Sequence, residues 1–227
     1  MTEARPKKAL LAGASGLVGA HVLARLLAHP AYAQVEVLVR RELSIRDPKC
    51  IQRIVDFERL DSAPHPQADD VFCCLGTTLK QAGSRDAFRR VDHDYPVALA
   101  RLALAGGARQ FLMVSALGAR ANAGVFYSRV KGETEQDIGA LRLPRVVFMR
   151  PSLLLGERRD KRPGERAGIV ISKLIAPLLR GPLRKYRPIH ADDVAAAMLY
   201  AANHETRSGP IESDQMLYFA QREPLAP

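Results

Sequence analysis

The 227-residue chain lacks the features that mark several classes of protein. Its cysteines, Cys50, Cys73 and Cys74, are odd in number and two are adjacent, which argues against a disulfide framework. No Cys-x-x-Cys pair or cysteine–histidine cluster occurs, so we expect no metal site. No apolar run approaches the roughly 18 residues that a membrane-spanning helix needs. No apolar segment precedes the first predicted strand, and we expect a cytoplasmic protein.

One segment, residues 158–187, has few acidic residues and many Lys and Arg, so it holds most of the net positive charge of the chain. The formal net charge is +10, and residues 158–187 supply +8 of it, from ten Lys and Arg and two acids. A solvated arginine-rich surface, an anionic substrate, an acidic protein partner and a peripheral membrane contact are all compatible with this charge. Nucleic acid is disfavoured, because Tyr186 is the only aromatic residue in the segment.

Apolar runs that suit buried strands alternate with helical patterns along the chain. Strands are predicted at 8–12, 35–39, 50–56, 71–75, 111–114 and 146–149, and helices at 17–27, 84–105, 127–141 and 192–202, with Pro96 starting or kinking a helical segment. This alternation predicts an α/β, Rossmann-type, doubly wound parallel sheet.

No linker divides the sequence, so we expect residues 1–227 to form one nucleotide-binding domain. The alternation of strands and helices breaks at about 156–188, which is basic and rich in proline and glycine. We interpret this stretch as a small substrate or lid lobe in the C-terminal part of the fold.

The first predicted strand runs into a glycine loop that opens the first helix. Gly13, Gly16 and Gly19 have GxxGxxG spacing. Gly13 permits a tight turn, Gly16 leaves room for a pyrophosphate, and Gly19 lets helix and sheet approach closely. The phosphates would meet the positive end of the helix dipole. This context predicts dinucleotide binding.

The end of the second strand indicates which dinucleotide binds. An NAD site places an acid there to accept from the ribose 2′-hydroxyl, whereas this chain has Arg40 and Arg41. Two guanidinium groups suit a 2′-phosphate, so we predict NADP(H) in preference to NAD(H). Asp56, at the end of the third strand, would approach the adenine or simply close a turn.

A tyrosine and a lysine four residues apart mark a candidate catalytic site. Tyr127 and Lys131 share one face of a predicted helix, and Ser115 ends the strand before it. The lysine would hold the cofactor ribose and make the phenol more acidic. The tyrosine would exchange a proton while hydride moves at the nicotinamide, and Ser115 would hydrogen-bond the substrate oxygen.

The combination resembles the extended or atypical short-chain dehydrogenase/reductases. It is similar in particular to the Tat-interacting-protein oxidoreductase group, through the segments CLGTT (74–78), FRRVDHDY (88–95), YSRVKGE (127–133) and RPGE (162–165). The segments RPSL (150–153) and PIHADDVA (188–195) resemble the extended branch as a whole.

The resemblance implies a role for each matching residue. Ser115, Tyr127 and Lys131 would be catalytic, and Pro151 would face the nicotinamide. The diphosphate would be lined by Gly13, Ser15, Gly16, Leu17 and Val18, the 2′-phosphate by Arg40 and Arg41, and the end of the fourth strand would present Leu75, Gly76 and Thr77. The chain departs from many relatives in one respect: neither of its two asparagines occupies the fourth helix, where a proton-relay asparagine is expected, and Asp92 lies nearby.

We therefore expect an NADP(H)-dependent oxidoreductase that acts on a small carbonyl or alcohol, and an anionic substrate is compatible with the basic segment. Two alternatives stay open: an NADP(H)-binding regulatory or redox-sensing protein without turnover, and a sugar-nucleotide epimerase or dehydratase. The sequence names neither the substrate nor the oligomeric state.

Overall fold

A computed structural model describes residues 5–156, 179, 181–204 and 206–223. Its main feature is a seven-stranded parallel sheet, as the alternating sequence predicts. The strands are β1 (Lys7–Ala12), β2 (Tyr32–Val39), β3 (Cys50–Ile54), β4 (Asp70–Cys73), β5 (Gln110–Val114), β6 (Val146–Arg150) and β9 (Gly209–Glu212).

The strand order is β3-β2-β1-β4-β5-β6-β9. The chain builds outward from β1 to β3, returns to the centre at β4, and then builds outward on the other side. In such sheets, ligands bind in the crevice beyond the carboxyl ends of the two central strands, where the order reverses. The topology therefore directs attention to the loops after β1 and β4.

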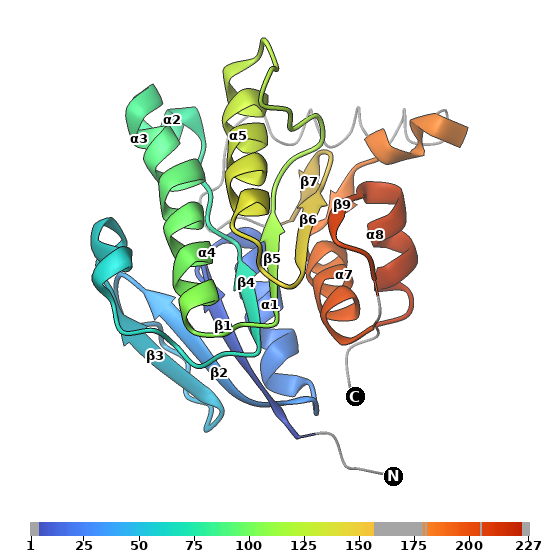
Figure 1. The fold of residues 1–227 in the computed structure, drawn as a ribbon. Helices are drawn as coiled ribbons and strands as arrows, with labels where there is room; N and C mark the ends of the chain where they lie inside the picture. Colours follow the sequence, from blue (N-terminus) through green and yellow to red (C-terminus); the bar gives the residue numbers. More distant parts are fainter. Residues whose placement is uncertain (1–4, 157–178, 180, 205, 224–227) are drawn as a thin grey trace.

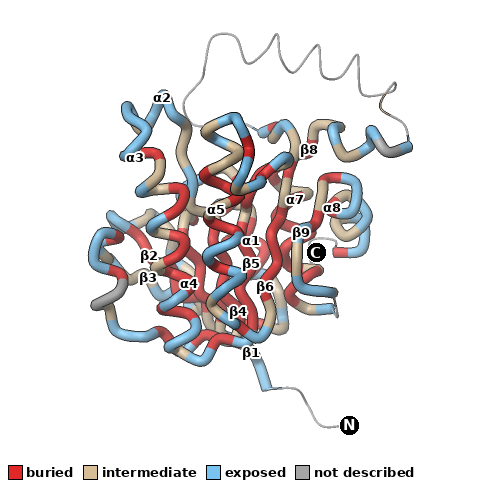
Figure 2. The backbone as a smooth tube through the Cα atoms, turned by 45° about the horizontal axis from the view of Figure 1, so that its top comes forward, coloured by how far each residue is buried: buried red, intermediate tan, exposed pale blue. Residues whose placement is uncertain are grey.

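Helices cover both faces of the sheet (Figure 1). On one face α1 (Leu17–Ala28) packs on α7 (Ala191–Asn203), which packs on α8 (Ser213–Ala220). On the other face lie α4 (Tyr95–Ala105), α5 (Phe126–Ala140) and the 3₁₀-helix η1 (Phe57–Ser62). Alternate residues of β1 serve the two apolar clusters, and the strands form the buried centre in Figure 2.

Asp70 closes the amino-terminal end of the sheet. Its buried carboxylate accepts hydrogen bonds from Lys7 Nζ (3.0 Å), Tyr32 Oη (2.6 Å) and Gln110 Nε2 (2.6 Å). Burial and this carboxylate both raise the pKa of Tyr32 well above its usual value. The network joins β1, β2, β4 and β5 at the end opposite the central crevice.

The predicted helix at 84–105 is three segments. They are α3 (Arg85–Arg89), the π-helical turn η2 (Arg90–Asp94) and α4, and a short helix α2 (Leu79–Ala82) precedes them. Pro96 lies in the first turn of α4, directly after the π-turn, so it starts a segment as expected. The π-turn is a feature that apolar periodicity does not reveal.

The C-terminal part adds elements that the sequence analysis did not predict. They are β9, α8, the 3₁₀-helix η4 (Gly181–Tyr186) and a small parallel pair, β7 (Leu154–Leu155) with β8 (Ile189–His190). The predicted third strand is also shorter and ends at Ile54, because Asp56 begins η1 as its cap. Most of the predicted lid, 157–178 and 180, lies outside the described residues.

Two glycines of α5 allow a matched test of how closely this helix packs against the loop at Arg120 and Ala121. A Cβ on Gly132 would lie 2.0 Å from the carbonyl carbon of Arg120, whereas a Cβ on Gly139 would meet nothing within 4 Å. We expect Gly132→Ala to lower the free energy of unfolding by about 1–3 kcal/mol through overpacking. Gly139→Ala should raise it by about 0.5–1 kcal/mol, because alanine favours the helix. Urea denaturation measures both, and an unchanged stability in Gly132→Ala would contradict this packing of α5.

Candidate cofactor and active site

The loop after β1 is built on glycines that no other residue could replace without a collision. Gly13 has a φ of +90°, and a Cβ there would lie 2.4 Å from the carbonyl oxygen of Cys74, at the end of β4. A Cβ on Gly19 would lie 2.1 Å from the carbonyl oxygen of Gly13. The two central loops are therefore in contact, and α1 starts close against the first of them.

The amino terminus of α1 is open to a ligand. Gly16 is its N-cap residue, no side chain caps the helix, and its first turn carries no acid. Ser15 and Gly16 are exposed, while Leu17 and Val18 continue into the helix. The free N–H groups and the helix dipole of such a terminus favour an anion. A loop whose glycines leave the backbone accessible, at the positive end of a helix, fits the diphosphate of a dinucleotide.

Arg40 and Arg41 directly follow β2 and are both exposed. Neither makes an ion pair with any residue that the structure describes. Asp56, which was considered for the adenine, accepts the N–H of Glu58 at 3.0 Å and caps η1. The plain turn that the sequence also allowed thus accounts for Asp56.

The loop after β4 lies beside α5, the helix that carries the predicted catalytic residues. The N–H of Thr77 donates to Asp92 Oδ2 at 2.8 Å. A Cβ on Gly76 would lie 3.4 Å from Asp92 Oδ1 and 3.7 Å from Lys131 Nζ. Leu75 packs against the core face that carries α4. The predicted cofactor-bordering residues of this loop therefore meet the predicted catalytic lysine.

Tyr127 and Lys131 lie one turn apart on α5 and differ sharply in exposure. Tyr127 is 37% exposed, whereas the side chain of Lys131 is 3% exposed. Lys131 Nζ lies 2.7 Å from Asp92 Oδ1, which is equally buried. The tyrosine is thus open to solvent, while the lysine is buried one turn further along the helix.

Ser115 follows β5 and contacts a second buried ion pair. Its hydroxyl donates to Glu135 Oε1 at 2.5 Å, and Glu135 also accepts from Arg150 at 2.5–3.2 Å. Hydrogen bonding to Glu135 is the main cause that raises the pKa of Arg150. The hydrogen bond to Glu135 therefore fixes the orientation of the Ser115 hydroxyl.

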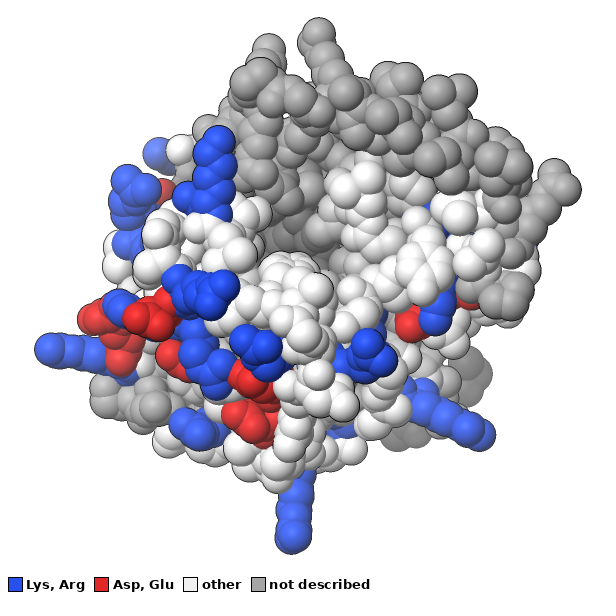
Figure 3. Space-filling view, turned by 90° about the horizontal axis from the view of Figure 1, so that it is seen from above, with Lys and Arg blue, Asp and Glu red and all other residues white. Residues whose placement is uncertain are grey.

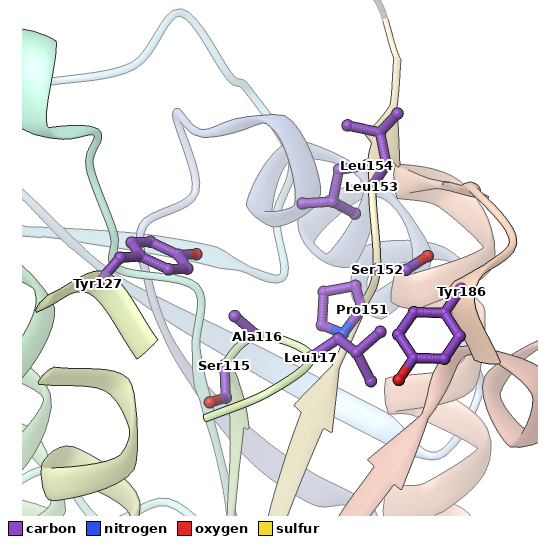
Figure 4. A pocket seen from close by; sticks show the side chains of 9 residues that line it. All are labelled: Ser115, Ala116, Leu117, Tyr127, Pro151, Ser152, Leu153, Leu154 and Tyr186. Carbon is purple, nitrogen blue, oxygen red and sulfur yellow. The ribbon is translucent and has the colours of Figure 1, made fainter. Parts of the chain in front are cut away.

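A cavity of about 350 Å³ brings the predicted residues Ser115, Tyr127 and Pro151 together. Its other lining residues are Ala116, Leu117, Ser152, Leu153, Leu154 and Tyr186. Tyr127 and Tyr186 stand on opposite sides, with the Tyr127 hydroxyl toward the cavity (Figure 4). Seen from above, uncharged side chains of described residues border part of a central hollow, and Lys and Arg side chains lie mainly to its left and below it (Figure 3).

The sequence analysis missed Glu135 and left the role of Asp92 undecided. Glu135 lies four residues after Lys131, so helical spacing alone could have placed it on the same face. The approach of Asp92 to Lys131 depends on the π-turn, which the sequence did not indicate.

Comparison with known proteins agrees with this arrangement. The NAD dependent epimerase/dehydratase family matches residues 9–212. The chain belongs to this family. It is an NAD(P)-binding protein of the extended short-chain dehydrogenase/reductase type, as its motifs predict.

Curated relatives confirm the resemblance to the Tat-interacting-protein group. The chain is 41% identical to Protein HTATIP2 of Rattus norvegicus over 164 residues, which are 70% of this chain and 67% of that protein. It is 35% identical to Protein FMP52, mitochondrial, of Eremothecium gossypii, over 95% of this chain and 98% of that protein.

Solved structures share the fold at low sequence identity. A UDP-glucose 4-epimerase of Thermotoga maritima, solved with UDP-glucose, has a TM-score of 0.65 at 18% identity and covers 95% of this chain and 82% of its own. The human epimerase family protein SDR39U1, solved with NADPH, has a TM-score of 0.63 at 17% identity, over 90% of this chain and 72% of its own. At these identities the likeness supports the fold.

The expectation of a cytoplasmic protein is wrong as a general statement. Several fungal relatives are named mitochondrial, among them those of Eremothecium gossypii and Aspergillus fumigatus. The absence of an apolar leading segment, on which the expectation rested, does not distinguish these compartments. Within the described part of the chain, no helix is both long and apolar enough to cross a membrane.

The cysteines give a testable pattern of reactivity. Burial raises the pKa of Cys73, which is fully buried, to about 12, and raises the pKa of Cys74 well above its usual value. Burial also raises the pKa of Cys50, but the side chain of Cys50 is only partly buried. Because the thiolate is the reactive form, we expect a thiol reagent at pH 7.5 to modify Cys50 first in the native protein. Peptide mapping would identify the site, and denatured protein serves as the control. Equal rates at Cys50 and Cys73 would contradict the burial of β4.

Proposed function

We propose that the protein is an NADP(H)-dependent oxidoreductase that interconverts a small carbonyl compound and its alcohol. The observation that carries the proposal is the placement of Tyr127 at the cavity with Lys131 buried behind it on the same helix. When bound, the nicotinamide would supply or accept the hydride. The side chain of Tyr127 would supply the proton, and the positive charge of Lys131 would lie near the tyrosine.

The hydrogen bonds of the lining hydroxyl groups support Tyr127 as the proton donor. Ser115 donates to Glu135 and Ser152 donates to the carbonyl of Arg187. The hydroxyls of Tyr127 and Tyr186 have no hydrogen-bond partner among the described residues. Of these two, Tyr127 interacts electrostatically with Lys131. Tyr127 is thus the hydroxyl that combines access with a nearby cation.

In the reducing direction, Tyr127 Oη would give its proton to the carbonyl oxygen as hydride reaches the carbonyl carbon. The positive charge of Lys131 would stabilise the tyrosinate that remains. Ser115, whose hydrogen is directed to Glu135, would contact the substrate oxygen once its hydroxyl rotates. Oxidation of the alcohol would reverse these transfers.

The charge at the end of β2 supports NADP(H) as the cofactor. Arg40 and Arg41 occupy the place where an NAD site needs an acid, and both are exposed and free of ion pairs with described residues. Structural neighbours carry NADPH or NAD, so the preference rests on the charge of this chain alone. Guanidinium groups bind a 2′-phosphate through charge-assisted hydrogen bonds.

We expect NADPH to bind at least about tenfold more tightly than NADH, because the 2′-phosphate gains such bonds. Arg40→Asp should narrow or reverse the preference, whereas Arg207→Asp should not. Arg207 is also exposed but precedes β9, at the opposite end of the sheet. Calorimetry at one salt concentration measures the affinities. Equal affinities in the unmodified protein would refute the preference.

Tyr127→Phe should lower kcat by about 100-fold or more, because it removes the transferable proton. NADPH affinity should change little. Tyr186→Phe, across the same cavity, is the matched control and should keep most of the activity. The measurement is substrate-dependent NADPH oxidation over a panel of aldehydes and ketones, and full turnover by Tyr127→Phe would exclude the assigned role.

Two other functions would give different results. A regulatory protein, which the absence of a relay asparagine favours, would bind NADPH and oxidise it with no member of the panel. A sugar-nucleotide epimerase, which the family favours, would bind UDP-glucose and convert it without net oxidation of the dinucleotide.

A further inference from the structure

Asp92 joins two segments that the proposed function places around the cofactor. One carboxylate oxygen pairs with Lys131 Nζ on α5 at 2.7 Å, and the other accepts the N–H of Thr77, after β4, at 2.8 Å. The two charged side chains are only 1% and 3% exposed. Gly76 lies against both, since a Cβ there would be within 3.7 Å of each. A single buried carboxylate thus fixes the lysine and the loop relative to one another.

The π-turn η2 fixes the carboxylate itself. A π-helical turn holds an extra residue, and such turns occur frequently at functional sites. Thr134 on α5 donates a hydrogen bond to the carbonyl oxygen of Asp92 at 3.0 Å. The ring of the next residue, His93, lies 2.7 Å from Asp94 and 2.9 Å from Asp137 on α5. The turn is therefore fastened to α5 at the backbone of Asp92 and at the side chain of the next residue.

The pair also controls the charge of Lys131. Burial alone lowers the pKa of a lysine, by several units when nothing compensates. Here burial is the largest single influence and lowers the pKa of Lys131, but Asp92, Tyr127 on the same helix and Cys73 on β4 together raise it above its usual value, and Asp92 contributes most among these three. An asparagine at 92 has a single acceptor oxygen, so it could accept from Lys131 or from Thr77 but not from both, and it would supply no charge.

We propose that Asp92 is a positioning residue, which keeps the buried Lys131 protonated and holds it against the Gly76–Thr77 loop where the cofactor ribose would lie. This inference rests on the proposed function, because it takes Lys131 to face the cofactor. The chain would thereby use a carboxylate–lysine pair in the helix where related enzymes carry an asparagine.

The test is Asp92→Asn, with Asp94→Asn as the matched control. Asp94 is an exposed carboxylate on the same π-turn and pairs with His93 instead of Lys131. The first measurement is an NMR titration of ¹³C-labelled lysine in cofactor-free protein, with Lys131→Arg to assign the signal. We expect Lys131 of Asp92→Asn to lose its proton about two pH units lower than in the unmodified protein. The control should leave its titration unchanged, and an unchanged titration in Asp92→Asn would overturn the proposal.

The second measurement is the affinity for NADPH between pH 6 and pH 9.5. In Asp92→Asn, we expect affinity close to that of the unmodified protein at pH 6 and about tenfold weaker affinity at pH 9.5, as the charged hydrogen bonds of Lys131 are lost. The ratio of the two affinities should stay constant with pH in Asp94→Asn. A ratio that does not change with pH in Asp92→Asn would refute the link to the cofactor.

The two measurements separate this inference from the proposed function. If no form of the protein binds NADPH at any pH, the proposed function fails, while the NMR titration still decides whether Asp92 keeps Lys131 charged. If Asp92→Asn does not fold, Asp92→Asn/Lys131→Met removes both charges and should regain much of the lost thermal stability. Failure of the double variant to regain any stability over the single variant would contradict the pairing.

Discussion

The close contact between the loops after β1 and β4 is the constraint on which the site depends. The chain at Gly13 passes so near the carbonyl oxygen of Cys74 that no side chain fits between them. This contact sits where the strand order reverses, and it leaves the start of α1 facing the loop that carries Gly76 and Thr77. A ligand at this end of the sheet would therefore meet backbone from both central strands, while side chains from the outer elements approach from the sides.

The second requirement is that charge be buried beneath the cavity without loss of stability. Removing two charges from water costs several kcal/mol per ion unless the geometry and additional hydrogen bonds compensate. The Asp92–Lys131 pair gains such bonds from Thr77, and Glu135 gains them from Arg150 and Ser115. Both pairs lie beside residues of the predicted catalytic trio. The two ion pairs, Asp92–Lys131 and Glu135–Arg150, thus lie next to the residues for which catalytic roles are proposed.

The sequence predicts most of the architecture because the signals are local. Apolar runs identify the six strands up to β6, and the glycine spacing identifies the turn after β1. β9 is missed because its sequence, GPIE, is short and contains a proline, which an edge strand tolerates but propensity disfavours. The predicted helix at 84–105 hides the π-turn because its hydrophobic pattern continues across the extra residue.

Side-chain partners were harder to predict, since they depend on tertiary placement. YxxxK spacing places Tyr127 and Lys131 on one face, yet nothing local indicates that one is partly exposed and the other buried. That difference suits their proposed roles. A proton donor has to touch the substrate, whereas a cation acts most strongly on its neighbours where water is excluded. Burial of Lys131 is in turn tolerable because Asp92 faces it, so a single ion pair allows a cation to lie in the interior one helical turn from a solvent-accessible phenol.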